Sequence, residues 1–270
     1  ELPELPEVET IRRDLIRDVK GKKIKDVEIL NPKVIKEPKP AEFKRRLKGA
    51  TFQDFLRRAK VLAMKLSTGD YLVVHLRMTG QLIYSAEKQE KARVVFVLSG
   101  GRYLSFNDQR LFAELRLVCD WQKLKFVREL GIEPLTKEFT VKKFKEMLAN
   151  KKTRIKPLLM DQTFIGGIGN LYAQEALFLA GILPGRPANR LKGEEIKGLH
   201  RAIQKVLQDA IQCRGSSVDE YVNGRGKKGD YHLRLKVYGR RGRPCVKCKT
   251  GIKKISLGGR GTCFCPKCQK

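Results

Sequence analysis

The 270-residue sequence has no run that approaches 18 consecutive apolar residues, and its N-terminus carries no signal peptide. These absences predict a chain that neither spans a membrane nor is exported. Acidic residues are also scarce: 29 Asp and Glu stand against 58 Lys and Arg, which gives a formal net charge of +29. A solvated surface explains an excess of a few charges, so this excess predicts a polyanionic partner, with nucleic acid as the first choice. A membrane surface and the ribosome are the alternatives on charge alone.

Cysteine is rare outside the last 26 residues, which hold five of the seven cysteines. The other two are isolated, so a disulfide framework is not expected. Two Cys-x2-Cys pairs separated by sixteen residues have the spacing of a four-thiolate zinc site, formed by Cys245, Cys248, Cys265 and Cys268. Redox dithiols are the alternative. Four protein ligands leave no open position on the metal, so we expect one structural Zn²⁺ and interpret Cys263 as a free thiol.

Hydrophobic periodicity divides the chain into a strand-rich part and a helical part. In the first 120 residues, alternating segments predict strands over 23–30, 51–66, 70–77 and 94–98. After a linker over 131–134, helical spacing dominates over 141–148, 155–159, 171–179 and 194–211. We therefore expect an α+β fold with an N-terminal β-sandwich and one leading helix over 1–133, a helical domain over 134–236 and a zinc finger over 237–270.

The N-terminal stretch 3–10 places three glutamates beside proline or apolar residues. Apolar residues then recur at helical spacing, at Leu5, Val8, Ile11, Leu15 and Val19. This pattern predicts an amphipathic helix, in which Pro6 is tolerated because the first helical N–H groups have no partner within the helix. On local pattern alone, Glu4 and Glu7 merely complement the helix dipole.

Three glycines, at 166, 167 and 169, precede Asn170, which we predict to cap the helix that follows. Glycines let a phosphate approach the backbone, and a helix N-terminus offers free N–H donors. Together with the N-terminal stretch and the cysteine-rich tail, this motif resembles the bacterial formamidopyrimidine-DNA glycosylases (the Fpg/MutM family). Members of that family excise oxidised purines from DNA and then cut the strand. The matching motifs occur at both ends and in the middle of the chain, in the family's order.

The resemblance implies that Pro3 is the nucleophile, which attacks C1′ of the damaged nucleotide, and that Glu4 handles the protons. A proline with a free nitrogen is a secondary amine, able to form a cationic iminium with a sugar aldehyde carbon. Here Glu1 and Leu2 precede Pro3, and an acylated proline nitrogen cannot attack. Leu2 stands where the family has its initiator Met, so we expect a mature chain that begins at Pro3. If Glu1 and Leu2 are retained, the alternative is a non-catalytic zinc-containing DNA-binding protein.

Further matches in the strand-rich part concern the catalytic pocket and the DNA duplex. Lys60, which we place on a strand, matches a lysine that enters the family's catalytic pocket. Met78, Arg110 and Phe112 match a trio that fills the space left by the flipped nucleotide. On local pattern alone, Met78 and Phe112 would be core residues. Arg93 replaces the family's usual histidine and keeps a cation for a phosphate contact.

In the helical part, the resemblance implies a helix–two-turn–helix element in which Asn170 grips the phosphate beside the lesion. Lys151 and Lys156 match phosphate-facing and base-facing lysines. Tyr172 and Glu175 are expected to support the site, although core packing explains Tyr172 equally well.

Two further segments complete the implied DNA contacts. The turn over 257–262 presents Arg260 to a phosphate, and Arg260 and Lys60 together set the geometry of the phosphate and sugar. The basic, glycine-rich segment 216–231 matches a loop that closes over the extruded base, and its composition indicates mobility.

The function implied by the resemblance is a bifunctional DNA glycosylase and abasic-site lyase of base excision repair. It removes oxidised purines such as 8-oxoguanine and formamidopyrimidines, and it cuts the strand by β,δ-elimination. A related branch that prefers oxidised pyrimidines is a rival, disfavoured by the N-terminal stretch and the Met78, Arg110 and Phe112 trio. The expected partner is double-stranded DNA with an oxidised purine or an abasic site, and no cofactor besides zinc is needed. We expect a monomer in the bacterial cytoplasm, associated with the nucleoid.

Overall fold

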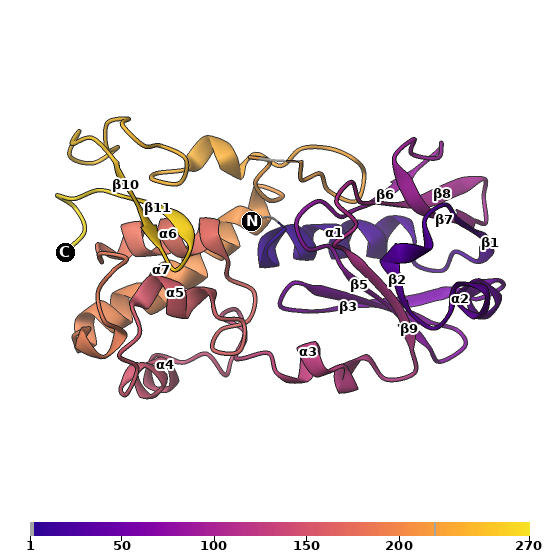
Figure 1. The fold of residues 1–270 in the computed structure, drawn as a ribbon, viewed down its shortest axis with the longest axis horizontal. Coiled ribbons are helices and arrows are strands. Elements are labelled where there is room, and N and C mark those ends of the chain that lie inside the picture. The colour runs from indigo at the N-terminus through magenta and orange to yellow at the C-terminus, as the bar shows by residue number, and fades with distance from the viewer. Residues whose placement is uncertain (1–2, 219) are drawn as a thin grey trace. The chain divides into compact units, whose positions relative to one another are not determined.

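The computed structural model describes residues 3–218 and 220–270, which form two units (Figure 1). The first unit joins the segment that ends at Glu129 to Cys213–His232. The second unit joins Leu130–Gln212 to Leu233–Lys270. No helix within the described residues has the length and apolar character needed to cross a bilayer. The predicted α+β class is confirmed, whereas the bounds of the three predicted domains stay predictions.

The first unit contains two sheets. One has the strand order β1-β7-β8-β6 and is antiparallel throughout. The other has the order β2-β9-β5-β4-β3, in which only the β2–β9 pair is parallel. The strands are β1 (Ile24–Ile29), β2 (Ile35–Glu37), β3 (Phe52–Arg58), β4 (Val61–Leu66), β5 (Tyr71–His75), β6 (Gln81–Ser85), β7 (Ala92–Leu98), β8 (Arg102–Asn107) and β9 (Glu114–Val118).

Helix α1 (Leu5–Asp18) packs against β3 and β4 of one sheet and against β6 of the other (Figure 1). Its apolar stripe, predicted from helical spacing, is fully buried at Leu5, Ile11 and Leu15. The helix therefore lies in the core of the first unit, and its N-terminal end carries Pro3 and Glu4.

Two local predictions for the first unit are wrong. Lys60 lies in the turn between β3 and β4 and not on a strand, because the chain reverses at Ala59, whose φ is 50°. Apolar residues alternate in the strands on both sides of this turn, so the sequence pattern does not indicate where the turn lies. The leading helix is also not the only one in this unit. Helix α2 (Pro40–Leu47) begins at a proline and buries Phe43 and Leu47, one helical turn apart.

The second unit is mainly helical. Helix α6 is buried over most of its length and packs against α5, α7 and β11, while α4 packs against α7. The helices are α4 (Val141–Leu148), α5 (Ile155–Met160), α6 (Asn170–Ala180) and α7 (Gly193–Gln212), and the hairpin strands are β10 (Lys253–Leu257) and β11 (Arg260–Phe264). A short helix α3 (Lys125–Arg128) belongs to the first unit, and 3-10 turns occur at Pro32–Val34, Trp121–Lys123, Ala188–Arg190 and Tyr231–Arg234.

Candidate functional site

The N-terminal end of α1 is fixed by a pair of buried glutamates. Glu4 is the N-cap, and the Glu4 and Glu7 side chains each accept a hydrogen bond from the other's backbone in a capping box. The Glu4 N–H donates to Glu7 Oε2 at 2.9 Å, and Glu7 Oε1 accepts the Ser216 N–H at 2.9 Å. The glutamates therefore do more than complement the helix dipole, since they organise the backbone next to Pro3. Glu1 and Leu2, which decide whether the Pro3 nitrogen is free, lie outside the described residues.

A third glutamate attaches α1 to the neighbouring sheet. Glu9 accepts hydrogen bonds at 2.8–3.0 Å from Arg12, Arg13 and Arg57, and Arg57 belongs to β3. Burial opposes ionisation of Glu9 and acts to raise its pKa, but the three arginines outweigh this effect and lower the pKa from 4.5 to about 2. Sequence reasoning did not assign Glu9 a role. Its ion pairs hold the helix that carries Pro3 against β3.

Two turns bring Met78, Arg110 and Phe112 together, and their predicted insertion into DNA stays a prediction. An Arg110 guanidinium N–H donates to Met78 Sδ at 3.4 Å, and the guanidinium carbon lies 4.8 Å from the centre of the Phe112 ring. Phe112 is 52% exposed, so it is not a core residue. Arg110 and Phe112 are exposed and Met78 is half-buried, so the three side chains form a cluster that reaches the surface of the first unit.

The buried Asp108 holds these turns in place, a role that sequence reasoning missed. Its carboxylate accepts a hydrogen bond from Thr79 Oγ1 in one turn and from the Arg110 and Ala113 N–H groups in the other. Its backbone carbonyl accepts the Arg93 Nε–H at 2.8 Å. Arg93 thus contacts the turn that carries Arg110, and its predicted phosphate contact stays a prediction.

The half-buried Lys60 lies near His75, the last residue of β5. Burial lowers the pKa of His75 to about 3, and the charges of Arg77 and Lys60 act in the same direction, against Glu114. His75 Nδ1 accepts the Arg77 N–H at 3.2 Å, which fits a neutral imidazole. His75 is therefore uncharged at neutral pH and adds no positive charge beside Lys60.

In the second unit, Lys156 and Asn170 belong to one buried polar network. The Lys156 ammonium is fully buried and donates to Asn170 Oδ1 at 2.6 Å and to Thr262 Oγ1 at 2.9 Å. Gln174 Nε2 donates to Asn170 Oδ1 and to the Gly261 carbonyl, and Gln174 Oε1 accepts the Cys263 N–H at 2.7 Å. The network fixes the start of α6 against the β10–β11 hairpin.

The prediction that Asn170 caps α6 is wrong. Gly169 is the N-cap, and Asn170 is the first helical residue, with its side-chain oxygen engaged by Lys156 and Gln174. Gln174 was missed in the sequence, although its spacing of four residues from Asn170 places both on one helix face.

The remaining predicted residues of this unit differ in exposure. Lys151 and Arg260 are exposed, and Arg260 follows the positive-φ glycines 258 and 259 in the hairpin turn. Tyr172 is 1% exposed and packs in the core, so its DNA contact stays a prediction. The buried Glu175 accepts the N–H groups of residues 236, 237 and 238 and so anchors the chain where it enters the cysteine-rich tail.

The four cysteines predicted as zinc ligands come together at one point. Sγ atoms of Cys245, Cys248, Cys265 and Cys268 all lie within 4.8 Å of one another. A set of four thiolates at this separation fits a tetrahedral Zn²⁺ and leaves the metal no open position. Zinc bound here would tie the β10–β11 hairpin to the preceding Cys245–Cys248 turn. Cys263 is buried but is not part of this ligand set.

Comparisons with known proteins cover nearly the whole chain. Family models match it as the "Formamidopyrimidine-DNA glycosylase N-terminal domain" over residues 2–115, the "Formamidopyrimidine-DNA glycosylase H2TH domain" over 130–222 and the "Zinc finger found in FPG and IleRS" over 242–270. Formamidopyrimidine-DNA glycosylase of Pelotomaculum thermopropionicum is 47% identical, with 100% of this chain and 99% of the relative covered. The Bacillus subtilis protein of the same name is 43% identical, with 99% of each covered.

Solved structures agree with the sequence matches. Lactococcus lactis Fpg in complex with abasic-site DNA has a TM-score of 0.92 at 36% identity, covering 99% of this chain and 100% of that one. MutM (Fpg) of Thermus thermophilus has a TM-score of 0.89 at 38% identity, covering 99% and 98%. The predicted family, the zinc finger and the one-zinc site are confirmed. The chain therefore belongs to the formamidopyrimidine-DNA glycosylase (Fpg/MutM) family of DNA repair glycosylases.

Proposed function

We propose that this chain excises oxidised purines, 8-oxoguanine and formamidopyrimidines, from double-stranded DNA and then cuts the strand at the resulting abasic site. The observation that carries the proposal is the buried capping box of Glu4 and Glu7, which fixes the backbone next to Pro3 at the start of a core helix. Complexes of Lactococcus lactis Fpg with abasic-site DNA and of its G226P mutant with Fapy-dG DNA support the substrate class.

The chemistry begins with the lone pair of the Pro3 nitrogen. It forms a bond to C1′, while the glycosidic bond breaks and its electrons leave with the base, which takes up a proton. Glu4 is placed next to Pro3 to transfer protons in this step and in the opening of the sugar ring. The nitrogen then loses its proton, and the C1′–O4′ bond breaks while O4′ takes up a proton, which gives the iminium. Loss of a C2′ proton from the iminium expels the 3′ phosphate, and loss of the C4′ proton then expels the 5′ phosphate. An α-amine with a pKa of about 8 is about one-tenth neutral at pH 7, which suffices for attack.

The other predicted residues act on the DNA. Met78, Arg110 and Phe112 occupy the space that the flipped nucleotide leaves, which offsets a few kcal/mol of unstacking. Lys151, Asn170 and Arg260 contact phosphates, as do Arg93 and Lys60. Lys156 holds Asn170 in place from within the core, and Tyr172 supports the helix start. The segment 216–231 covers the extruded base. We propose that the protein acts as a monomer on bacterial chromosomal DNA, in keeping with its bacterial relatives.

Borohydride trapping tests the nucleophile. A chain that begins at Pro3 should give a covalent adduct with an 8-oxoguanine duplex, and peptide mass mapping should place the adduct on Pro3. The matched control is the chain with Glu1 and Leu2 retained, which should bind the duplex with similar strength but form no adduct at Pro3, because an amide nitrogen cannot form an iminium. A faint adduct at Lys60 is compatible with this mechanism. If the extended chain nicks the duplex as fast as the trimmed one, the proline mechanism is wrong, and binding without any adduct in either form supports the non-catalytic alternative.

A further inference from the structure

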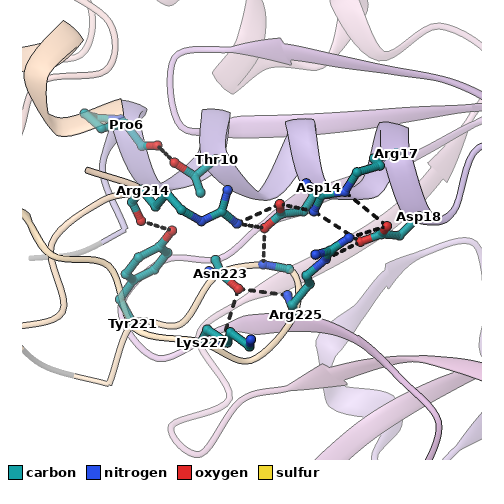
Figure 2. Close-up of polar contacts among 11 residues, drawn as sticks. Pro6, Thr10, Asp14, Arg17, Asp18, Arg214, Tyr221, Asn223, Arg225 and Lys227 are labelled. Carbon is teal, nitrogen blue, oxygen red and sulfur yellow. Dashed lines mark hydrogen bonds and ion pairs between the residues drawn. The ribbon is translucent and has the colours of Figure 1, made fainter. Parts of the chain in front are cut away.

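One face of α1 carries four polar side chains at helical spacing: Glu7, Thr10, Asp14 and Asp18. Steps of three, four and four residues place them on one line along the helix. They face the segment Cys213–His232, which belongs to the same unit. Figure 2 shows Asp14 and Asp18 beside Arg214 and Arg225 of this segment. This line is separate from Glu9, which pairs with arginines of α1 and β3.

Each carboxylate on this line binds a different part of the segment. Asp14 is 1% exposed and accepts hydrogen bonds from the Arg214 guanidinium at 2.7 Å to both oxygens and from the Gly224 N–H at 3.2 Å. Asp18 accepts the Arg225 Nε–H at 2.7 Å and an Nη2–H at 2.8 Å. Figure 2 shows these contacts side by side along the helix. The segment is therefore bound to α1 at two places, at Arg214 and at Gly224 and Arg225.

The segment also contains hydrogen bonds of its own, and its expected mobility stays a prediction. The Tyr221 hydroxyl donates to the Arg214 carbonyl at 3.1 Å, and Asn223 Oδ1 accepts the N–H groups of Arg225 and Lys227 (Figure 2). Gly224 fits the close approach to the helix, because a Cβ at this position would lie 2.8 Å from Asp14 Cβ. Sequence reasoning missed this contact because Asp14 and Gly224 are 210 residues apart.

We propose that Asp14 and Asp18 are positioning residues that hold Arg214, Gly224 and Arg225 on α1, and that this latch controls base excision but not cleavage at a preformed abasic site. The inference rests on the proposed function, in which the loop covers the extruded base. The helix that carries Asp14 and Asp18 also carries Pro3 and Glu4, so the latch fixes the loop relative to the nucleophile. An abasic site has no base to cover, and the loop position does not affect its cleavage.

The size of the effect follows from the burial of each carboxylate. Loss of the Asp14 charge leaves Arg214 without its bidentate partner and weakens the bond to a buried N–H, so excision by Asp14→Asn should fall about tenfold or more. The Arg225 side chain is 45% exposed, so Asp18→Asn and Arg225→Gln should each lower excision about threefold. Asp18→Glu keeps the negative charge and should recover most of the rate.

Single-turnover rates on an 8-oxoguanine duplex and on a preformed abasic duplex test the proposal. The variants should lose excision while abasic cleavage stays within about twofold of wild type. Glu28→Gln is the matched control, because Glu28 forms a 2.7 Å ion pair with Lys88 in the same unit away from this line. Equal loss on both substrates, no loss on either, or an Asp18→Glu variant as slow as Asp18→Asn would overturn the proposal. Arg225→Gln leaves α1 unchanged and keeps the test valid if Asp14→Asn folds poorly.

Hydrogen exchange of the free protein separates the latch from the catalytic function. Peptides covering 214–228 should exchange faster in Asp14→Asn and in Arg225→Gln than in wild type, whereas Glu28→Gln should not change them. Unchanged exchange overturns the latch and leaves the proposed function standing. If the variants exchange faster but the wild-type protein excises no base, the latch exists and the proposed function is wrong. The role of the latch in excision is then wrong as well.

Discussion

The ion pairs of Glu9 allow a quantitative test of how α1 is held in the fold. Glu9→Gln keeps the shape of the side chain but removes the charge that three arginines contact. A pKa lowered from 4.5 to about 2 corresponds to about 3 kcal/mol of stability at neutral pH. Arg13 is 60% exposed, so screening by water reduces the expected loss to about 2 kcal/mol.

The pH dependence has a definite sign. Because the pKa of Glu9 is lower in the folded state, its contribution is fully present above pH 4.5 and is lost as the pH falls toward 2. At pH 3.5 the unfolded chain is already mostly protonated at this residue while the folded chain is not. The difference between wild type and Glu9→Gln should therefore shrink by about 1 kcal/mol between pH 7 and pH 3.5.

Urea unfolding followed by fluorescence measures this difference. Trp121 is the single tryptophan of the chain, is 5% exposed and belongs to the same unit as Glu9. Glu90→Gln, at an exposed position of this unit, is the control and should change stability by less than about 0.5 kcal/mol. A Glu9→Gln variant as stable as wild type at pH 7, or a difference that grows as the pH falls, would refute the reasoning.

Three further predictions concern zinc, the wedge and the phosphate contacts. Cys265→Ser should contain less zinc per chain than wild type. It should also bind an abasic-analogue duplex at least about tenfold more weakly, because zinc no longer holds the β10–β11 hairpin to the Cys245–Cys248 turn. A metal-free protein that binds the duplex with full affinity would contradict this prediction. Phe112→Ala should slow excision from duplex about tenfold but spare cleavage of a single-stranded abasic site, since only the duplex requires unstacking; equal loss on both would indicate a structural role. Arg260→Ala and Asn170→Ala should weaken binding whichever base is damaged, and Arg260→Ala should flatten the salt dependence by about one charge. A changed lesion preference with an unchanged salt slope would speak against the phosphate contact.

The sequence predicted best where the relevant signal is local. The spacing of the two Cys-x2-Cys pairs predicted the cluster that the structure contains, and helical periodicity predicted α4 at its observed bounds, Val141–Leu148. Resemblance to a family added the trio of Met78, Arg110 and Phe112, whose assembly depends on two turns that periodicity does not show.

The errors occur where tertiary contacts decide the conformation. Lys60 was placed on a strand because apolar alternation continues through a turn that only the φ of Ala59 reveals. Asn170 was predicted as a cap from residue type, but its oxygen is taken by the buried Lys156. The roles of Glu9 and Asp14 depend on arginines 48 and 200 residues further along the chain. No local pattern records such a separation.

The position of Gln174 has a thermodynamic consequence for the zinc finger. Its side chain contacts Asn170 at the start of α6 and both Gly261 and Cys263 in the hairpin. Binding free energies of two ligands to one protein are coupled reciprocally. If zinc strengthens DNA binding through this contact, bound DNA must strengthen zinc binding by the same factor. Damaged DNA should then protect the finger from a chelator, and Gln174→Leu should weaken that protection while leaving the four thiolates in place. Retention of the metal and affinity for DNA would thus be linked through the Gln174 amide, next to the contacts that Lys156 makes with Asn170 and Thr262.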